Sequence, residues 1–127
     1  MTRNPWTQTV PAYFYALLIV FLGSIPMGPL LPQQFEYGDK FEHCVAFAVF
    51  EVLVYRAVRF SRPMFSRVRG HVLAVVMVSL AGAGLEVWQS VIPWRSSDLL
   101  DWVADTVGAF GAALLAMGVA AVPRKAG

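Results

Sequence analysis

Four long apolar segments occupy most of this chain, and each is close to the length that crosses a lipid bilayer. They run from about Val10 to Leu31, Phe41 to Val58, Val72 to Ile92 and Leu99 to Val122. A crossing helix needs about 20 predominantly apolar residues. The chain is 57% hydrophobic and only 14% charged, whereas a soluble domain typically has about 25% charged residues. The sequence therefore predicts an all-α, four-helix transmembrane bundle that forms one domain over residues 1–127.

Basic residues are distributed unevenly over the connections between these segments. Arginines surround the connection between the second and third segments: Arg56, Arg59, Arg62, Arg67 and Arg69. Arg3 precedes the first segment, and Arg124 and Lys125 follow the fourth. Because basic residues in short loops stay cytoplasmic, we expect both termini and the arginine-rich connection to face the cytoplasm. Contact with the lipid bilayer explains these arginines better than nucleic acid, which is not an expected partner.

The first segment is expected to remain in the protein as a membrane anchor. Arg3 followed by an apolar run is also typical of a cleaved signal peptide, but the run here is longer than the roughly 7–15-residue core of such a peptide. Cleavage would leave three helices and move one terminus outside. Pro26, Pro29 and Pro32 are expected to kink or end this helix near the outer face.

Polar side chains gather at the outward ends of the second, third and fourth segments. They are Asp39, Lys40, His43, Glu86, Gln89, Arg95, Asp98, Asp101 and Asp105. Residues three or four positions apart share one face of a helix, so most of these residues form one stripe on each helix. Ionisable groups inside or at the rim of a hydrocarbon layer are costly and by default mark a functional site. We expect the three stripes to converge in a pocket that opens to the outside.

An alternative is that these residues only hold the helices together, because polar groups buried in a membrane must find partners. Lys40 and Arg95 would then neutralise the aspartates of the fourth helix, and His43 would bond Glu86. Asp98 would also cap the fourth helix by accepting hydrogen bonds from its first N–H groups.

Two further features concern the interior of the bundle. Glu51 lies deeper in the membrane than the other acidic residues, and we expect a protonated carboxyl bonded to a neighbouring helix. Small residues let membrane helices approach closely, so Gly108 and Gly111, opposite Gly82 and Gly84, predict tight packing between the third and fourth helices.

The order and spacing of the polar residues resemble those of a known family. The pattern D-K-x-x-H at 39–43 is followed by E-x-x-Q at 86–89, by R-x-x-D-x-x-D at 95–101, and then by Asp105 and two glycines. This order is similar to that of the VanZ-like family of small bacterial membrane proteins, in which Asn usually stands at the position of Asp105. The family is named for a protein associated with low-level resistance to the glycopeptide teicoplanin. The resemblance therefore implies a location in the bacterial inner (plasma) membrane and a connection with the cell envelope, and no particular reaction.

The chemistry of the site residues favours binding of an anionic envelope lipid or a glycopeptide-related ligand. Lys40 and Arg95 would meet its phosphate or carboxylate, with Arg95 supplying a forked pair of donors. Asp98, Asp101 and Asp105 supply hard oxygen ligands that would suit Mg²⁺ or Ca²⁺.

Three other functions are compatible with the same residues. The protein would be a hydrolase or transferase acting on a polyprenyl-phosphate lipid if His43 were a catalytic acid or base, oriented by Asp39 or Glu86. It would be a subunit or assembly factor if exposed aromatic residues contacted a partner membrane protein. Proton or ion transport would use Glu51, Glu86 and Asp105 as relay groups.

Overall fold

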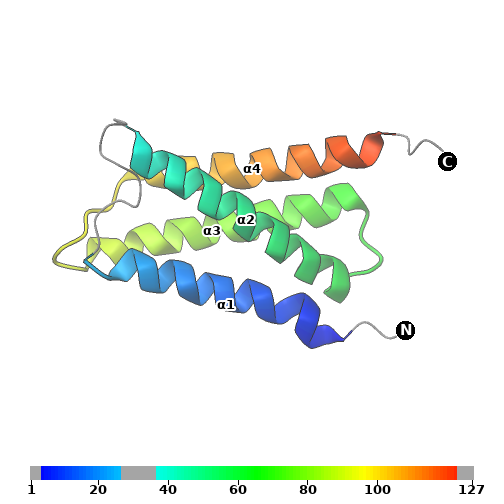
Figure 1. Cartoon of the computed structure of the whole chain (residues 1–127), viewed down its shortest axis with the longest axis horizontal. Coiled ribbons are helices and arrows are strands. Elements are labelled where there is room, and N and C mark those ends of the chain that lie inside the picture. Colours follow the sequence, from blue (N-terminus) through cyan, green and yellow to red (C-terminus); the bar gives the residue numbers. More distant parts are fainter. Residues whose placement is uncertain (1–3, 27–36, 123–127) are drawn as a thin grey trace.

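The protein, described by a computed structural model over residues 4–26 and 37–122, forms four α-helices and no strand within those two ranges. The helices are α1 (Pro5–Ser24), α2 (Gly38–Ser61), α3 (Arg67–Ser90) and α4 (Leu99–Ala121). They run alternately up and down (Figure 1). The end of the bundle with Ser24, Gly38, Ser90 and Leu99 is called the site end, and the opposite end, with the α2–α3 connection, the arginine end. The prediction of an all-α, four-helix fold is confirmed.

Three of the helices begin where a side chain accepts a hydrogen bond from a free backbone N–H group. These capping residues are Asn4 for α1, Ser66 for α3 and Asp98 for α4. The cap at Asp98 confirms the prediction for that residue. Because Ser66 caps α3, this helix begins at Arg67 instead of the predicted Val72, and His71 lies inside it.

The first helix ends earlier than the predicted Leu31. It stops at Ser24, and Ile25 is extended, with φ −81° and ψ 150°. Ile25 precedes Pro26, and a proline disfavours the helical conformation of the residue before it. The predicted span is therefore wrong at residues 25 and 26, and its remainder, with Pro29 and Pro32, lies outside the described residues.

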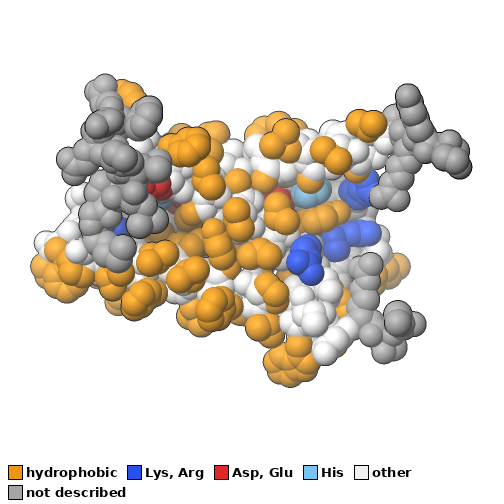
Figure 2. Space-filling view, viewed as in Figure 1, with side chains coloured by type: hydrophobic (Ala, Val, Ile, Leu, Met, Phe, Trp, Pro, Cys, Tyr) orange, Lys and Arg blue, Asp and Glu red, His pale blue; other side chains and the backbone are white. Residues whose placement is uncertain are grey.

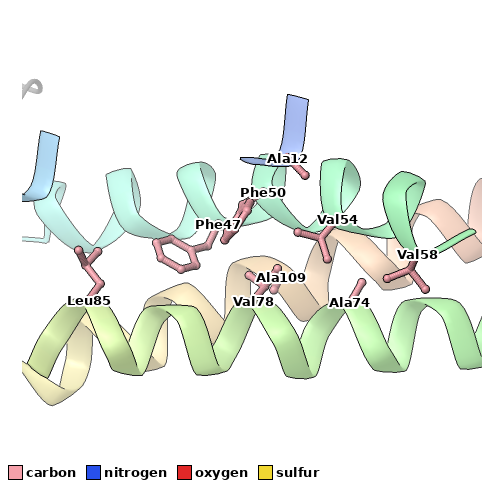
Figure 3. Close-up of a cluster of buried hydrophobic side chains, with 9 residues drawn as sticks. All are labelled: Ala12, Phe47, Phe50, Val54, Val58, Ala74, Val78, Leu85 and Ala109. Carbon is pink, nitrogen blue, oxygen red and sulfur yellow. The ribbon is translucent and has the colours of Figure 1, made fainter. Parts of the chain in front are cut away.

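The second helix is the centre of the bundle, because α2 packs against each of the other three helices. Its buried face includes Phe47, Phe50, Val54 and Val58. These side chains point into the space between α2 and α3, where they meet Ala74, Val78 and Leu85 of α3 and Ala109 of α4 (Figure 3). Ala12 of α1 closes the same cluster. The apolar core therefore sets the position of α2 relative to the polar residues of α3 and α4.

The face of the bundle seen in Figure 2 carries apolar side chains along its length. Large side chains such as Phe14, Leu80 and Leu115 are each more than 65% exposed, and soluble monomers rarely expose contiguous apolar surface on this scale. Three helices, α1, α3 and α4, are long and apolar enough to cross a membrane, which indicates a membrane protein. The sequence predicted four crossing helices. The exception, α2, carries charged residues at both ends and Glu51 between them.

Two glycines allow the helices to approach closely at the site end. A Cβ on Gly82 of α3 would lie 2.8 Å from Oδ2 of Asp105, so this glycine makes room for an α4 side chain. A Cβ on Gly108 of α4 would overlap the carbonyl group of Cys44 on α2. The predicted packing of α3 on α4 holds at Gly82, but Gly108 faces α2, and Gly84 and Gly111 have open space around them.

We predict opposite effects for two alanine substitutions on α4. Gly108→Ala forces α2 and α4 apart and should destabilise the protein by about 1–3 kcal/mol, as overpacking does elsewhere. Gly111→Ala meets nothing within 4 Å and should be neutral or stabilising by up to about 1 kcal/mol, because alanine favours a helix over glycine. Thermal unfolding of both variants in the same detergent measures the difference. Equal stability of the two would contradict the close contact at Gly108.

Candidate functional site

Lys40 joins the first turns of α2 and α4 at the site end. Its Nζ donates to Oδ2 of Asp98 and to Oδ1 of Asp101, both at 2.9 Å, and to Oδ2 of Asp39 at 3.3 Å. The Lys40 side chain is 20% exposed and that of Asp101 is 13% exposed, so this pair is shielded from solvent, whereas Asp98 and Asp39 are 42% and 52% exposed. All three hydrogen bonds of the ammonium group are used within the protein.

Asp98 links three parts of the site. Its side chain accepts from Lys40 and from the N–H of Leu100, which lowers the pKa of the carboxyl below its ordinary value and keeps it ionised. Its own backbone N–H donates to Oε2 of Glu86 at 2.8 Å. The start of α4 is thereby attached to the end of α3.

His43 lies one turn deeper than Lys40, on the same face of α2. Its Nδ1 is 2.8 Å from Oδ1 of Asp105, and its Nε2 is 3.7 Å from Oδ2 of Asp101. The hydrogen-bond partner of His43 is therefore Asp105 on α4. The alternative interpretation of the sequence expected Glu86 on α3 and is wrong on this point.

Glu86 and Asp105 form the deepest part of this cluster. Glu86 is 6% exposed and Asp105 is fully buried. Oε1 of Glu86 and Oδ2 of Asp105 are also buried and have no hydrogen-bond partner among the described residues. A buried polar atom without a partner is costly and requires a physical explanation.

Two of the expected site residues, Gln89 and Arg95, bind the end of α1 and not the other polar residues of the site. Gln89 Nε2 and Arg95 Nε donate to the carbonyl oxygen of Gly23, at 3.1 and 2.8 Å. The last carbonyl groups of a helix lack intrahelical partners, and these donors supply one at the end of α1. The indole N–H groups of Trp88 and Trp94 donate in the same region, to Ser24. Arg95 therefore secures α1 and does not neutralise the aspartates of α4, contrary to the alternative interpretation.

The sequence-predicted residues thus separate into two groups at one end of the bundle. The polar cluster consists of Asp39, Lys40, His43, Glu86, Asp98, Asp101 and Asp105. The α1 clamp consists of Gln89 and Arg95 on Gly23, with Trp88 and Trp94 on Ser24.

A second polar contact lies towards the arginine end, and the sequence analysis predicted only one of its two residues. Glu51 does bond a neighbouring helix: its Oε1 is 2.7 Å from Nδ1 of His71 on α3, and both side chains are almost completely buried. The Tyr55 ring stacks on His71 at 3.7 Å between centroids. His71 was not singled out because the predicted third helix began after it. The available signal was that Glu51 needs a partner inside the membrane and that the sequence holds only two histidines.

The cluster has more carboxyl groups than cations. Five acidic side chains surround one lysine and one histidine, so a cation is a better direct ligand here than an anion. Asp98 and Asp101 are engaged by Lys40, which argues against the predicted Mg²⁺ or Ca²⁺ site on Asp98, Asp101 and Asp105. The group within the described residues whose geometry could hold a metal ion is instead His43, Glu86 and Asp105, with one donor atom from each lying within 4.8 Å of the other two.

Comparison with known proteins assigns no family to the chain. No family model, no curated protein and no solved structure matches it. The resemblance to the VanZ-like family therefore rests on the order and spacing of the motifs at 39–43, 86–89 and 95–101.

We predict that Lys40 and Asp101 are energetically coupled. Lys40→Met should destabilise the protein by about 2 kcal/mol, because it leaves shielded carboxylates without their charged donor. Combining Lys40→Met with Asp101→Asn should recover at least about 1 kcal/mol, the coupling expected of residues in one network. Chemical or thermal unfolding of the two single variants and the double variant in detergent gives this energy.

Asp39 provides the matched control for this cycle. It also contacts Lys40, but at 3.3 Å and with a side chain that is 52% exposed. Exposed ion pairs contribute about 0–1 kcal/mol, so a cycle with Asp39→Asn should give a smaller coupling. Equal coupling of Lys40 to Asp39 and to Asp101 would contradict the shielded network.

Proposed function

We propose that this chain is a VanZ-like, multi-pass protein of the bacterial inner membrane that binds an anionic envelope lipid or a glycopeptide-related ligand at its outer face. Support for the family comes from the motif order. Support for the binding site comes from one observation: Arg95 is held in place by Gly23 through its Nε, and its terminal amino groups make no hydrogen bond within the described residues.

The proposal includes four crossing helices. α1, α3 and α4 are apolar enough to cross by composition. α2 lies among them, and its buried Glu51 pairs with His71 of α3, so its most deeply placed charge does not face lipid. An α2 that crosses the membrane within this bundle satisfies the requirement that polar groups in the bilayer be paired inside the protein.

The direction of the bundle follows from the basic residues. Lys and Arg side chains gather where α2 meets α3 (Figure 2), and such residues stay on the cytoplasmic side. The site end is at the opposite end of the helices. We infer that the polar cluster and the α1 clamp are at the outer face, where envelope lipids present their headgroups.

Arg95 suits an anionic headgroup better than Lys40 does. Lys40 already donates to three carboxylates, so an anion at its ammonium group would face those carboxylates. The guanidinium group of Arg95 lies instead in the α1 clamp, and its fork of donors matches phosphate or carboxylate. Trp88 and Trp94 are about half exposed beside it, as is common for aromatic residues at the level of lipid headgroups.

Catalysis is a weaker proposal for the same site. Both ring nitrogens of His43 face carboxylates of α4. Within the described residues no serine, threonine or cysteine side chain hydrogen-bonds His43, so an activated nucleophile is not paired with it. Binding of a ligand without turnover requires neither a free ring nitrogen on His43 nor an activated nucleophile.

We predict that Arg95→Gln weakens retention of an anionic lipid. The loss of a charge-assisted hydrogen bond costs about 1.5–3 kcal/mol, equivalent to roughly 10- to 100-fold in affinity. Native mass spectrometry of the purified protein titrated with phosphatidylglycerol, with phosphatidylcholine as the neutral comparison, measures this change. Arg95→Lys should retain part of the affinity, because it keeps the charge but loses the fork.

The control for this experiment is Arg67→Gln. Arg67 is exposed at the arginine end, so the substitution removes the same charge from the opposite face. Arg67→Gln should affect phosphatidylglycerol retention less than Arg95→Gln does. Equal losses from the two variants, or unchanged retention by Arg95→Gln, would sink the assignment of the ligand to Arg95.

A further inference from the structure

We infer that His43, Glu86 and Asp105 form a binding site for a divalent transition-metal ion such as Zn²⁺ or Mn²⁺. The three residues come from α2, α3 and α4, so the site joins the three helices of the polar cluster. One donor atom from each lies within 4.8 Å of the other two. Ligand bonds in such sites are about 2.0–2.2 Å long, and small side-chain movements bring this group to that geometry.

The first independent observation is the pair of buried oxygens without partners. Oε1 of Glu86 and Oδ2 of Asp105 belong to side chains that are at least nine-tenths buried, yet neither atom accepts a hydrogen bond from a described residue. Oδ2 of Asp105 points towards Gly82, one helical turn before Glu86 on α3. Carboxylate oxygens left in this position lose their hydration without compensation. A bound cation provides that compensation.

The second observation is that neighbouring groups hold Glu86 and face His43. Glu86 is held through its other oxygen, Oε2, by the backbone N–H of Asp98. If Nδ1 of His43 binds the metal in place of the proton between it and Asp105, the remaining Nε2–H faces Asp101 at 3.7 Å. A carboxylate behind a metal-ligating histidine fixes the ring and raises its basicity.

The donor set selects the class of metal. One imidazole nitrogen and two carboxylate oxygens suit Zn²⁺, Mn²⁺ or Fe²⁺, whereas Mg²⁺ and Ca²⁺ prefer oxygen ligands alone. A neutral histidine with two carboxylates carries a charge of about −2, which a divalent ion neutralises inside the low-dielectric bundle. Three protein ligands also leave a position for water or a ligand oxygen.

A depression on the α3–α4 side is lined by one of the three proposed ligands. A depression of about 250 Å³ is lined by Ala83, Glu86, Ser97, Leu99 and Trp102. Glu86 therefore contributes to the wall of this depression as well as to the proposed metal site.

The test is isothermal titration of the purified full-length protein with Zn²⁺ and Mn²⁺, compared with Mg²⁺. Wild-type protein should bind Zn²⁺ or Mn²⁺ stoichiometrically and in preference to Mg²⁺, and binding should raise its melting temperature. Glu86→Gln and Asp105→Asn should each weaken the affinity by more than the roughly 10- to 100-fold typical of losing an outer partner. Asp101→Asn should fall within that 10- to 100-fold range. Asp39→Asn, which changes an exposed acid of the same cluster, should have little effect.

Both ligand substitutions preserve side-chain size, and the melting temperature of the metal-free variants confirms folding. Visible absorption of Co²⁺ bound to the wild-type protein, and its loss on adding Zn²⁺, tests the site without any variant. Absence of stoichiometric Zn²⁺ or Mn²⁺ binding, or equal effects of Asp39→Asn and Glu86→Gln, would overturn the inference. Arg95→Gln should leave metal affinity unchanged. The proposal of a metal site and the proposal of a lipid site are therefore tested independently.

Discussion

Pairing of charged side chains across helices is the constraint on which the rest of this bundle depends. In an apolar surrounding, a charge without a partner costs more than packing can offset. The protein meets this constraint on α2, which packs against all three other helices and carries Lys40, His43 and Glu51. Lys40 pairs with α4, His43 with α4 and Glu51 with α3. The apolar core and the close approach at Gly108 set the distances at which these pairs meet.

The two polar regions differ in how their charged side chains are paired. Near the arginine end, Glu51 and His71 form a pair covered by Tyr55, with both side chains almost fully buried. At the site end the network is larger, it reaches the surface, and it has more acidic groups than basic ones. A pair that only joins helices needs no such excess of charge. This excess of acidic groups is what distinguishes the site end as a place for a ligand, because, within the described residues, a buried carboxylate oxygen without a partner occurs at Glu51 as well as at Glu86 and Asp105.

The length and apolarity of the segments were sufficient to predict four helices and the gathering of the polar motifs at one end. Helix ends were less predictable, because Ser66 and Pro26 act locally and shift a boundary without changing the hydrophobic pattern. The partners of the polar side chains on neighbouring helices were the least predictable feature. Helical spacing shows that Lys40 and His43 share a face, but it does not show how α3 and α4 are rotated towards α2. That rotation decides that His43 meets Asp105 and that Arg95 meets Gly23. His71 was missed for a related reason, since its partner is on another helix and its own position was assigned to a connection.

The central claim is that the polar cluster lies at the outer face of a membrane-spanning bundle, and cysteine accessibility tests it most directly. In a Cys44→Ala background, Ser97→Cys places a thiol on the exposed connection before α4, and Met64→Cys places one in the α2–α3 connection, where Met64 is 95% exposed. A membrane-impermeant maleimide added to intact spheroplasts should label the Ser97→Cys protein, and should label the Met64→Cys protein only after permeabilisation. Labelling of Met64→Cys in intact spheroplasts, with Ser97→Cys protected, would contradict the account.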